Sequence, residues 1–522
     1  MNISGKRSNG ILMHITSLPS EFGIGDLGWG AYRFADSLKE CGANYWQLLP
    51  LGPTGYGNSP YAARSAFAGN ELLLSPVLLA EKGYLKASDL KHPEFPESKV
   101  DFEKVLQWKL PLLKKAAKAF LEKNRESKEY KAFLKKESYW LEDYSLFMVL
   151  YEKYNDARWH TIWDRKEGFR DSSTLKRIKK EQKEAISTWQ ALQYLFEDQF
   201  LALKSYVNRL GIRIIGDIPI FVGADSADSW ANLNLLKHDE KGHYTAVSGV
   251  PPDGFSPTGQ LWGNPVYDWK KHEESDFAWW KARIKRQLYL VDVLRIDHFR
   301  GFDAYYEIPA KDKTAEFGKW KKSPGKKFFD TLRKEMGELP IIAEDLGFMT
   351  DGVIKLRDSN GFPGMKIAQF GFNRDKAGFF NTFDDFLPMN YTRSFVAYTG
   401  THDNDTTRGW YNSLSNDDKH MVREYLSTDD KEAVWALIKA VMLSNADYAV
   451  FPMQDILELG EEARMNVPST CNDKNWSWRM KANAFDSYRV RRYSFLVRIS
   501  GRNGKTAEES EKEHLNLIRK EP

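Results

Sequence analysis

The stretch LYLVDVLRIDHFRG, residues Leu288–Gly301, decides the fold, because in it a short apolar run passes directly into a group of charged side chains. The run Leu290–Asp297 is rich in Val, Leu and Ile, which is typical of a strand covered on both faces of a parallel sheet. Helical patterns separate runs of this kind along the chain, and eight such strands alternating with helices predict an α/β fold, a (β/α)8 TIM barrel. The other seven runs are Gly10–Thr16, Asn44–Leu49, Ile212–Ile218, Pro340–Glu344, Met365–Phe370, Ser394–Thr399 and Tyr448–Met453.

Two long stretches interrupt this alternation. We expect residues 1–522 to form a single catalytic barrel domain that carries both of them as insertions. Residues 80–200 are rich in Lys, Glu, Leu and Tyr and poor in Gly and Pro, which predicts an inserted α-helical subdomain. Residues 223–285 are dense in Gly, Pro, Asn, Asp and Trp, which favours ordered loops over regular elements. Long loops in a compact domain are usually functional, so we expect this insertion to cover the active site.

Charge and cysteine content exclude several classes of protein. The 76 Lys and Arg against 72 Asp and Glu leave a net charge of +4, which gives no chain-wide basic surface for nucleic acid. The two cysteines provide no disulfide framework and suit a reducing compartment. The first residues lack the apolar run of a secretion signal, and no stretch approaches the ~20 apolar residues of a membrane span. We therefore expect a soluble, cytoplasmic protein without membrane or nucleic-acid partners.

Acidic residues follow the strands at the face where barrel enzymes carry their reactive groups. Arg295 and Asp297 lie two residues apart on one strand, so they point to the same side, and the guanidinium keeps the carboxylate ionised. Several acids at one barrel mouth cannot all ionise easily, so at least one should hold a proton at neutral pH. A carboxylate beside a carboxylic acid is the equipment for cleaving a glycosidic bond. The other strand-end groups are Asp217, Glu344, Asp345, His402, Asp403 and Asp405.

Other chemistries have weaker support in the sequence. The His-Asp pairs in RIDHF and THDND could serve a divalent metal, but the chain has no His-x-His pair and no His-Glu-x-x-His. It also has no Gly-x-Ser-x-Gly elbow and no P-loop. The high aromatic content, 14%, fits sugar binding, but composition alone favours aromatic side chains that fill a large core. We predict no metal and no cofactor.

Several longer motifs follow one another along the chain: GILMHITSLPSEFGIGDLG, WQLLPLGPTGYGNSPY, GDIPIFVGADSADSW, GVPPDGFSPTGQLWGNPVYDW, LRIDHFRGF, IIAEDLG and TGTHDNDT. As a set they resemble the motifs of the 4-α-glucanotransferases (amylomaltases, or disproportionating enzymes), relatives of the α-amylases. The resemblance runs nearly end to end and keeps the family order. It implies a retaining enzyme that cuts an α-1,4-glucan or maltooligosaccharide donor and passes the piece to the 4-hydroxyl of an acceptor glucan or glucose.

The resemblance also implies a role for individual residues. Asp297 would be the nucleophile that forms a covalent glucosyl-enzyme, Glu344 the general acid and base, and Asp403 the third carboxylate. Residues Gly249–Asn264 resemble the loop over the acceptor side, which we expect to hold the acceptor and exclude water. The residues implied to contact sugar are Arg295, His402, Asp217, Tyr56, Ser59, Tyr61, Gln260, Trp262, Asn264, His298 and Asn404.

One position departs from the family pattern. Ser469, in MNVPSTCNDKNWSWR, stands where the family has Gly, and a positive φ there would cost on the order of 1 kcal/mol. Two other functions stay open at this stage. One is a mainly hydrolytic α-glucosidase or amylase, and the other is a glucan-binding protein without activity. We expect a monomer or a weak homo-oligomer.

Overall fold

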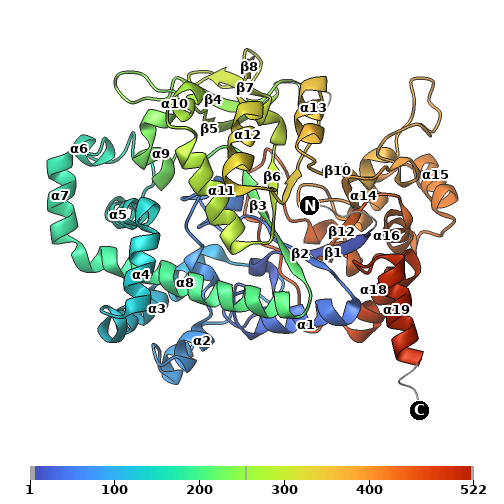
Figure 1. Ribbon diagram of the computed structural model, residues 1–522, viewed down its shortest axis with the longest axis horizontal. Coiled ribbons are helices and arrows are strands. Elements are labelled where there is room, and N and C mark those ends of the chain that lie inside the picture. Colours follow the sequence, from blue (N-terminus) through green and yellow to red (C-terminus); the bar gives the residue numbers. More distant parts are fainter. Residues whose placement is uncertain (1–5, 253–255, 519–522) are drawn as a thin grey trace.

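The computed structural model describes residues 6–252 and 256–518, and its centre is a barrel of eight parallel strands (Figure 1). Each strand falls on one of the predicted apolar runs, so the predicted TIM barrel is confirmed. The strands are β1 (Ser8–Leu12), β2 (Tyr45–Gln47), β3 (Arg213–Pro219), β6 (Val293–Asp297), β9 (Ile341–Ala343), β10 (Gly364–Ile367), β11 (Phe395–Tyr398) and β12 (Tyr448–Pro452).

The barrel order is β10-β11-β12-β1-β2-β3-β6-β9, and side-chain and backbone bonds join the last strand to the first. The amide of Ala343 at the end of β9 donates to the carbonyl of Pro363 before β10 at 2.9 Å. Asp345 adds a second link, because its Oδ1 accepts the amide of Met365 in β10 at 2.7 Å and its Oδ2 pairs with Arg357. This strand-end acid therefore closes the barrel, which is a structural role.

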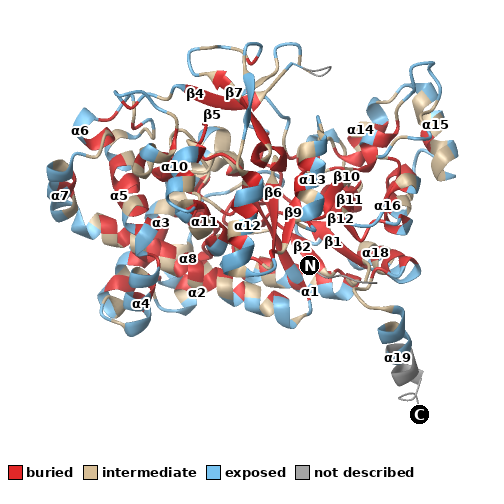
Figure 2. Ribbon diagram, turned by 45° about the horizontal axis from the view of Figure 1, so that its top comes forward, coloured by how far each residue is buried: buried red, intermediate tan, exposed pale blue. Residues whose placement is uncertain are grey.

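Helices that alternate with the strands surround the barrel, and their inner faces are buried together with the sheet (Figure 2). After the last strand the chain forms the short helix α17 and then the longer helices α18 and α19. The helices between and after the strands are α1 (Trp29–Cys41), α11 (Ala278–Leu290), α12 (Gly325–Met336), α13 (Asp351–Ser359), α14 (Thr407–Ser413), α15 (Asn416–Leu426), α16 (Ala433–Leu443), α17 (Met453–Ile456), α18 (Ser487–Ser500) and α19 (Ala507–Ile518).

The stretch between β2 and β3 is helical and lies to one side of the barrel (Figure 1). Several of its helices begin at side-chain caps: Asp101 accepts the amide of Lys104 at 3.1 Å, and Ser127 accepts that of Tyr130 at 3.2 Å. α8 (Lys183–Arg209) is one continuous helix that begins in this region and ends just before β3, so it is part of both the insertion and the helical layer around the barrel. The helices are α2 (Pro76–Glu81), α3 (Phe102–Asn124), α4 (Lys128–Lys136), α5 (Ser138–Tyr154), α6 (Arg165–Gly168), α7 (Ser172–Glu181) and α8 (Lys183–Arg209).

A second, antiparallel sheet stands above the barrel, at the top of Figure 1, with strand order β5-β4-β7-β8. Residues 223–285 therefore hold more regular structure than their composition suggests. The reason is non-local pairing, because β4 pairs with β7, which lies beyond this stretch in the sequence. The elements are α9 (Ala227–Ala231), β4 (Ala246–Val250), β5 (Gln260–Pro265), α10 (Trp269–Glu274), β7 (Ala304–Pro309) and β8 (Lys319–Lys322). In the described residues, no helix is long and apolar enough to cross a membrane.

Candidate active site

Arg295 on β6 connects two carboxylates at the mouth of the barrel. Its Nη1 donates to both oxygens of Asp217 on β3, at 2.8 and 2.7 Å, and its Nη2 donates to Oδ1 of Asp297 at 2.9 Å. The register explains this contact, since Asp217 lies opposite Arg295 and Pro219 opposite Asp297. Burial alone would lower the pKa of Arg295, but the two carboxylates raise it well above its usual value. The guanidinium is thus a permanent positive charge beneath Asp297.

Glu344 is a buried acid without a cationic hydrogen-bond partner. It directly follows β9, the neighbour of β6, and Ile296 lies opposite Ala343, so Asp297 and Glu344 occupy the next positions on adjacent strands. The amide of His298 donates to its Oε2 at 2.6 Å, and the amide of Leu346 donates to its Oε1 at 2.7 Å. Burial, and after it the charge of Asp297, raise the pKa of Glu344 to about 8 despite these bonds. Glu344 therefore holds a proton at neutral pH.

Asp403 is positioned by neighbours from the C-terminal part of the chain. The amide Nδ2 of Asn466 donates to its Oδ1 at 2.7 Å, and Nη2 of Arg464 donates to its backbone carbonyl at 2.8 Å. His402 Nε2 lies 3.4 Å from its Oδ2. These contacts fix the direction of a carboxylate that is 44% exposed and faces the cleft.

Aromatic rings line the cleft around these acids. Tyr61 stacks on His402 with ring centroids 4.9 Å apart, and its hydroxyl donates to Oδ2 of Asp217 at 2.8 Å. Trp476 packs against both rings. On the opposite side Trp262 meets His298 edge to face at 4.8 Å. Burial lowers the pKa of His298 to about 4, so this imidazole is neutral at pH 7.

The cleft has a volume of about 1020 Å³ and collects most of the residues predicted to contact sugar. The side chains of Glu344, Arg295 and Asp217 are buried, and each bonds a residue that lines the cleft: His298, Asp297 and Tyr61, respectively. Three predicted residues also make local bonds: Ser59 caps the turn at Tyr61, Gln260 accepts the indole N–H of Trp262 at 3.1 Å, and Asn264 donates to Val222. The predicted residues that line the cleft are Tyr56, Ser59, Tyr61, Gln260, Trp262, Asn264, Asp297, His298, His402 and Asp403.

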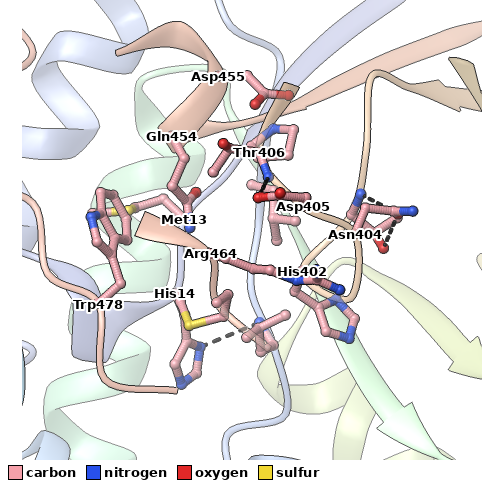
Figure 3. A pocket seen from close by; sticks show the side chains of 15 residues that line it. Met13, His14, His402, Asn404, Asp405, Thr406, Gln454, Asp455, Arg464 and Trp478 are labelled. Carbon is pink, nitrogen blue, oxygen red and sulfur yellow. Dashed lines mark hydrogen bonds between the residues drawn. The ribbon is translucent and has the colours of Figure 1, made fainter. Parts of the chain in front are cut away.

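Asn404 lines a different space, a small cavity of about 20 Å³ that His402 also lines (Figure 3). Its Oδ1 accepts the amide of Thr401 at 2.9 Å and the Thr401 hydroxyl at 3.0 Å, which holds the turn that carries His402 and Asp403. His14 also lines this cavity, and its Nδ1 accepts the amide of Leu49 at 3.3 Å. Burial, and then the proximity of His402, lower the pKa of His14 to about 3, so it packs as a neutral imidazole.

Several residues that line the cleft were not predicted from the sequence. Asn466 and Trp476 lie in the MNVPSTCNDKNWSWR run, so the family-like motif there carried a signal for them. The helical insertion adds Tyr151, Asp156 and Arg158 to the cleft wall, and no motif marks them. Among the described residues, no three His, Cys, Asp or Glu side chains gather as a metal site.

Comparison with known proteins agrees with this geometry. A sequence model of the 4-alpha-glucanotransferase family matches residues 13–484. The chain is 44% identical over 495 residues to the 4-alpha-glucanotransferase of Clostridium butyricum, covering 94% of this chain and 100% of that protein. It is 46% identical over 484 residues to the same-named protein of Thermus thermophilus, covering 91% and 95%. The solved structure of amylomaltase from Streptococcus agalactiae in complex with acarbose has a TM-score of 0.91 and 38% identity, covering 96% of this chain and 100% of that one.

Proposed function

Because this chain belongs to the 4-α-glucanotransferase family and is an enzyme of that type, we propose that it transfers α-1,4-glucan segments through a covalent intermediate on Asp297. The donor is an α-1,4-glucan or maltooligosaccharide, and the acceptor is the 4-hydroxyl of another glucan or of glucose. The observation that carries the proposal is the pairing of an ion-paired Asp297 with a protonated, buried Glu344 on adjacent strands.

In the first step the glycosidic C1–O bond breaks. Arg295 holds Oδ1 of Asp297, so we assign the attack on C1 to Oδ2. The proton of Glu344 passes to the departing oxygen, which leaves as the hydroxyl of the released glucan. Each Glu344 oxygen accepts one amide, and a carboxylic hydroxyl can accept such a bond and still donate its own proton.

In the second step the acceptor hydroxyl attacks C1, its proton returns to Glu344, and the C1–Oδ2 bond to Asp297 breaks. Two inversions give net retention, which requires carboxyls about 5–5.5 Å apart. Neighbouring strands lie about 4.8 Å apart, and Glu344 Oε2 accepts the amide directly after Asp297, which fits direct capture of C1. Asp403 faces the same cleft, and we assign it to the sugar hydroxyls and to the positive charge that develops at the transition state.

Transfer instead of hydrolysis requires that an acceptor sugar replaces water at the second step. We assign this role to the loop Gly249–Asn264, of which residues 253–255 lie outside the described part of the structure. Trp262, which lies on β5 within this segment, is 38% exposed and contacts His298, the residue after Asp297. Its ring can thus form one wall of the acceptor position. Trp262→Ala should raise the share of hydrolysis products, and an unchanged share would remove the loop from the explanation.

Incubation with pure maltotriose tests the proposal and separates it from a mainly hydrolytic activity. Transfer yields glucose together with oligomers longer than maltotriose, whereas hydrolysis yields only shorter sugars. Asp297→Asn should abolish turnover, and a glucosylated Asp297 should be detectable by mass spectrometry after acid quench of Glu344→Gln with an activated glucosyl donor. Full turnover by Asp297→Asn would reject the mechanism. Binding without any turnover by the wild type would favour the inactive glucan-binding alternative.

A further inference from the structure

A second aromatic pocket, with a volume of about 320 Å³, lies outside the barrel where α5, α9 and α11 meet. Buried Phe67 is at its centre, and three rings surround it. The centroid of Phe67 lies 5.6 Å from Tyr139, 6.3 Å from Trp140 and 5.7 Å from Trp279. Tyr139 and Trp140 come from the helical insertion, and Trp279 comes from the barrel helix before β6, so the pocket spans the seam between them.

The pocket is open and edged with polar groups. Tyr139 is 51% exposed, so its ring is available to a ligand. Space between the rings comes from alanines on α9 and α11, and Asp143 and Asn232 lie among the lining residues. The alanines are Ala227, Ala231, Ala278 and Ala282.

Shared elements place the pocket close to the active-site cleft. Arg64 lines the cleft and the next residue, Ser65, lines the pocket. Asp225 lines the cleft and Ala227 lines the pocket. On α5, Tyr151 faces the cleft and Tyr144 the pocket, which at 1.5 Å per residue separates their Cα atoms by roughly 10 Å along the helix. The two sites are therefore built on the same segments and lie close together.

The chemistry of the pocket favours a neutral polyhydroxylated ring. Aromatic faces pack against the apolar face of a sugar, and carboxylate and amide groups bond its hydroxyls. A cationic ligand is disfavoured because both acids already have partners: Asp143 pairs with Nη2 of Arg170 at 2.6 Å, and the buried Asp228 accepts the amide of Ala66 at 2.7 Å. The pocket therefore combines ring platforms with hydrogen-bonding groups and lacks a free negative charge.

We propose that this pocket is a second binding site for the α-glucan substrate, taking one or two glucose units of a long chain whose other part lies in the cleft. The inference rests on the glucan specificity proposed above. A chain held at two places binds more tightly than one held at a single place, because the second contact is intramolecular. The pocket should increase the affinity for long glucans. It should not change the affinity for maltotriose, which the cleft alone accommodates.

Two variants test the pocket without touching the catalytic groups. Tyr139→Ala removes the exposed ring, and Ala278→Trp fills the space from the exposed start of α11 without removing any core contact. Both should raise KM for amylose and weaken retardation in an amylopectin gel by about two- to tenfold, the range expected for loss of one aromatic contact. Both should keep the kcat/KM for maltotriose. Phe495→Ala, an exposed ring on α18 outside both cavities, is the matched control and should change neither.

Unchanged amylose KM and unchanged gel retardation in both variants would overturn the inference. An equal loss on maltotriose and amylose would overturn it as well, because it would show a general effect on the cleft. The pocket stands if either variant selectively impairs amylose, and melting temperatures identify a variant that has failed to fold. Failure of the wild type to act on maltotriose would instead reject the proposed function, so the two outcomes are distinct.

Discussion

Replacement of Glu344 by Gln should change how the stability of the protein depends on pH. In the folded state burial raises the pKa of Glu344 from 4.5 to about 8, whereas the unfolded chain exposes the group to water. Between these values the unfolded state loses the proton and the folded state keeps it, so wild-type stability falls as pH rises. At about 1.4 kcal/mol for each pH unit, the loss amounts to at most ~5 kcal/mol and is complete above about pH 8.

Urea unfolding of wild type and Glu344→Gln between pH 4 and 9 measures this loss. The Gln variant has no such proton, so its unfolding free energy should rise relative to wild type from about pH 4.5 and level off above pH 8. Any cost of placing an amide against the amides of His298 and Leu346 is the same at every pH, so only the slope is diagnostic. Asp171→Asn, measured over an added range from pH 2 to 5, provides a control of opposite sign. Side-chain bonds from Ser173 and then Thr174 lower the pKa of Asp171 to about 2, so its contribution is present above about pH 4 and is lost in acid.

A difference between the two proteins that stays constant from pH 4 to 9 would refute the reasoning. Kinetics provide an independent check on the same proton. The kcat/KM for maltotriose should fall about tenfold for each pH unit above 8, where Glu344 no longer holds the proton that the leaving oxygen needs. An alkaline limb that begins near pH 5 would show that the acid is not the buried Glu344.

Three further predictions concern the rim of the cleft. Ser469→Gly should raise the free energy of urea unfolding by about 0.5–1 kcal/mol. Ser469 has φ +62°, and the backbone strain that glycine releases there exceeds the chain entropy that it adds to the unfolded state. An unchanged free energy of unfolding would contradict this. Maleimide should label exposed Cys471 in the cleft and should not label Cys41, because Cys41 is buried and burial raises its pKa to about 12. The label should lower the activity of the wild type but not that of Cys471→Ser. Asn466→Ala should lower kcat for maltotriose about tenfold or more, since Asp403 loses a 2.7 Å bond that directs it; unchanged kcat would show that the carboxylate needs no such support.

The sequence was most informative about the barrel. A strand covered on both faces is a continuous apolar run, so each barrel strand could be recognised from its own residues, as Val293–Asp297 shows. The strands of the upper sheet could not be recognised in this way. β5 contains exposed Leu261 and Trp262 and depends on β4, which in turn depends on β7. Pairing of this kind is decided by segments far apart in the chain, and composition does not record it.

The positive φ of Ser469 shows what a single departure from a motif can reveal. We expected strain because Ser469 stands where the family has Gly, and the structure places Ser469 in the left-handed region. The MNVPSTCNDKNWSWR motif marked the segment that holds Asn466 but not its contact with Asp403, because an asparagine in a loop more often makes local turn bonds. The cleft wall contributed by Tyr151 and Arg158 likewise follows from where the helical insertion packs.

Residue types alone show that several acids gather at the barrel mouth, but not which of them is the general acid and which is the nucleophile. The charge balance at the barrel mouth explains this difference. Arg295 is shared by Asp217 and Asp297, so one positive charge already faces two carboxylates. Glu344 lies next to this group, is buried, and has only amide donors, so a further negative charge there is unfavourable and the proton remains. Asp403 differs from Glu344 in its surroundings, because it is partly exposed and accepts a bond from Asn466. The different roles of the acids therefore depend on where the Arg295 guanidinium points, and a variant that moved it, such as Arg295→Lys, should disturb both carboxylates that it now holds.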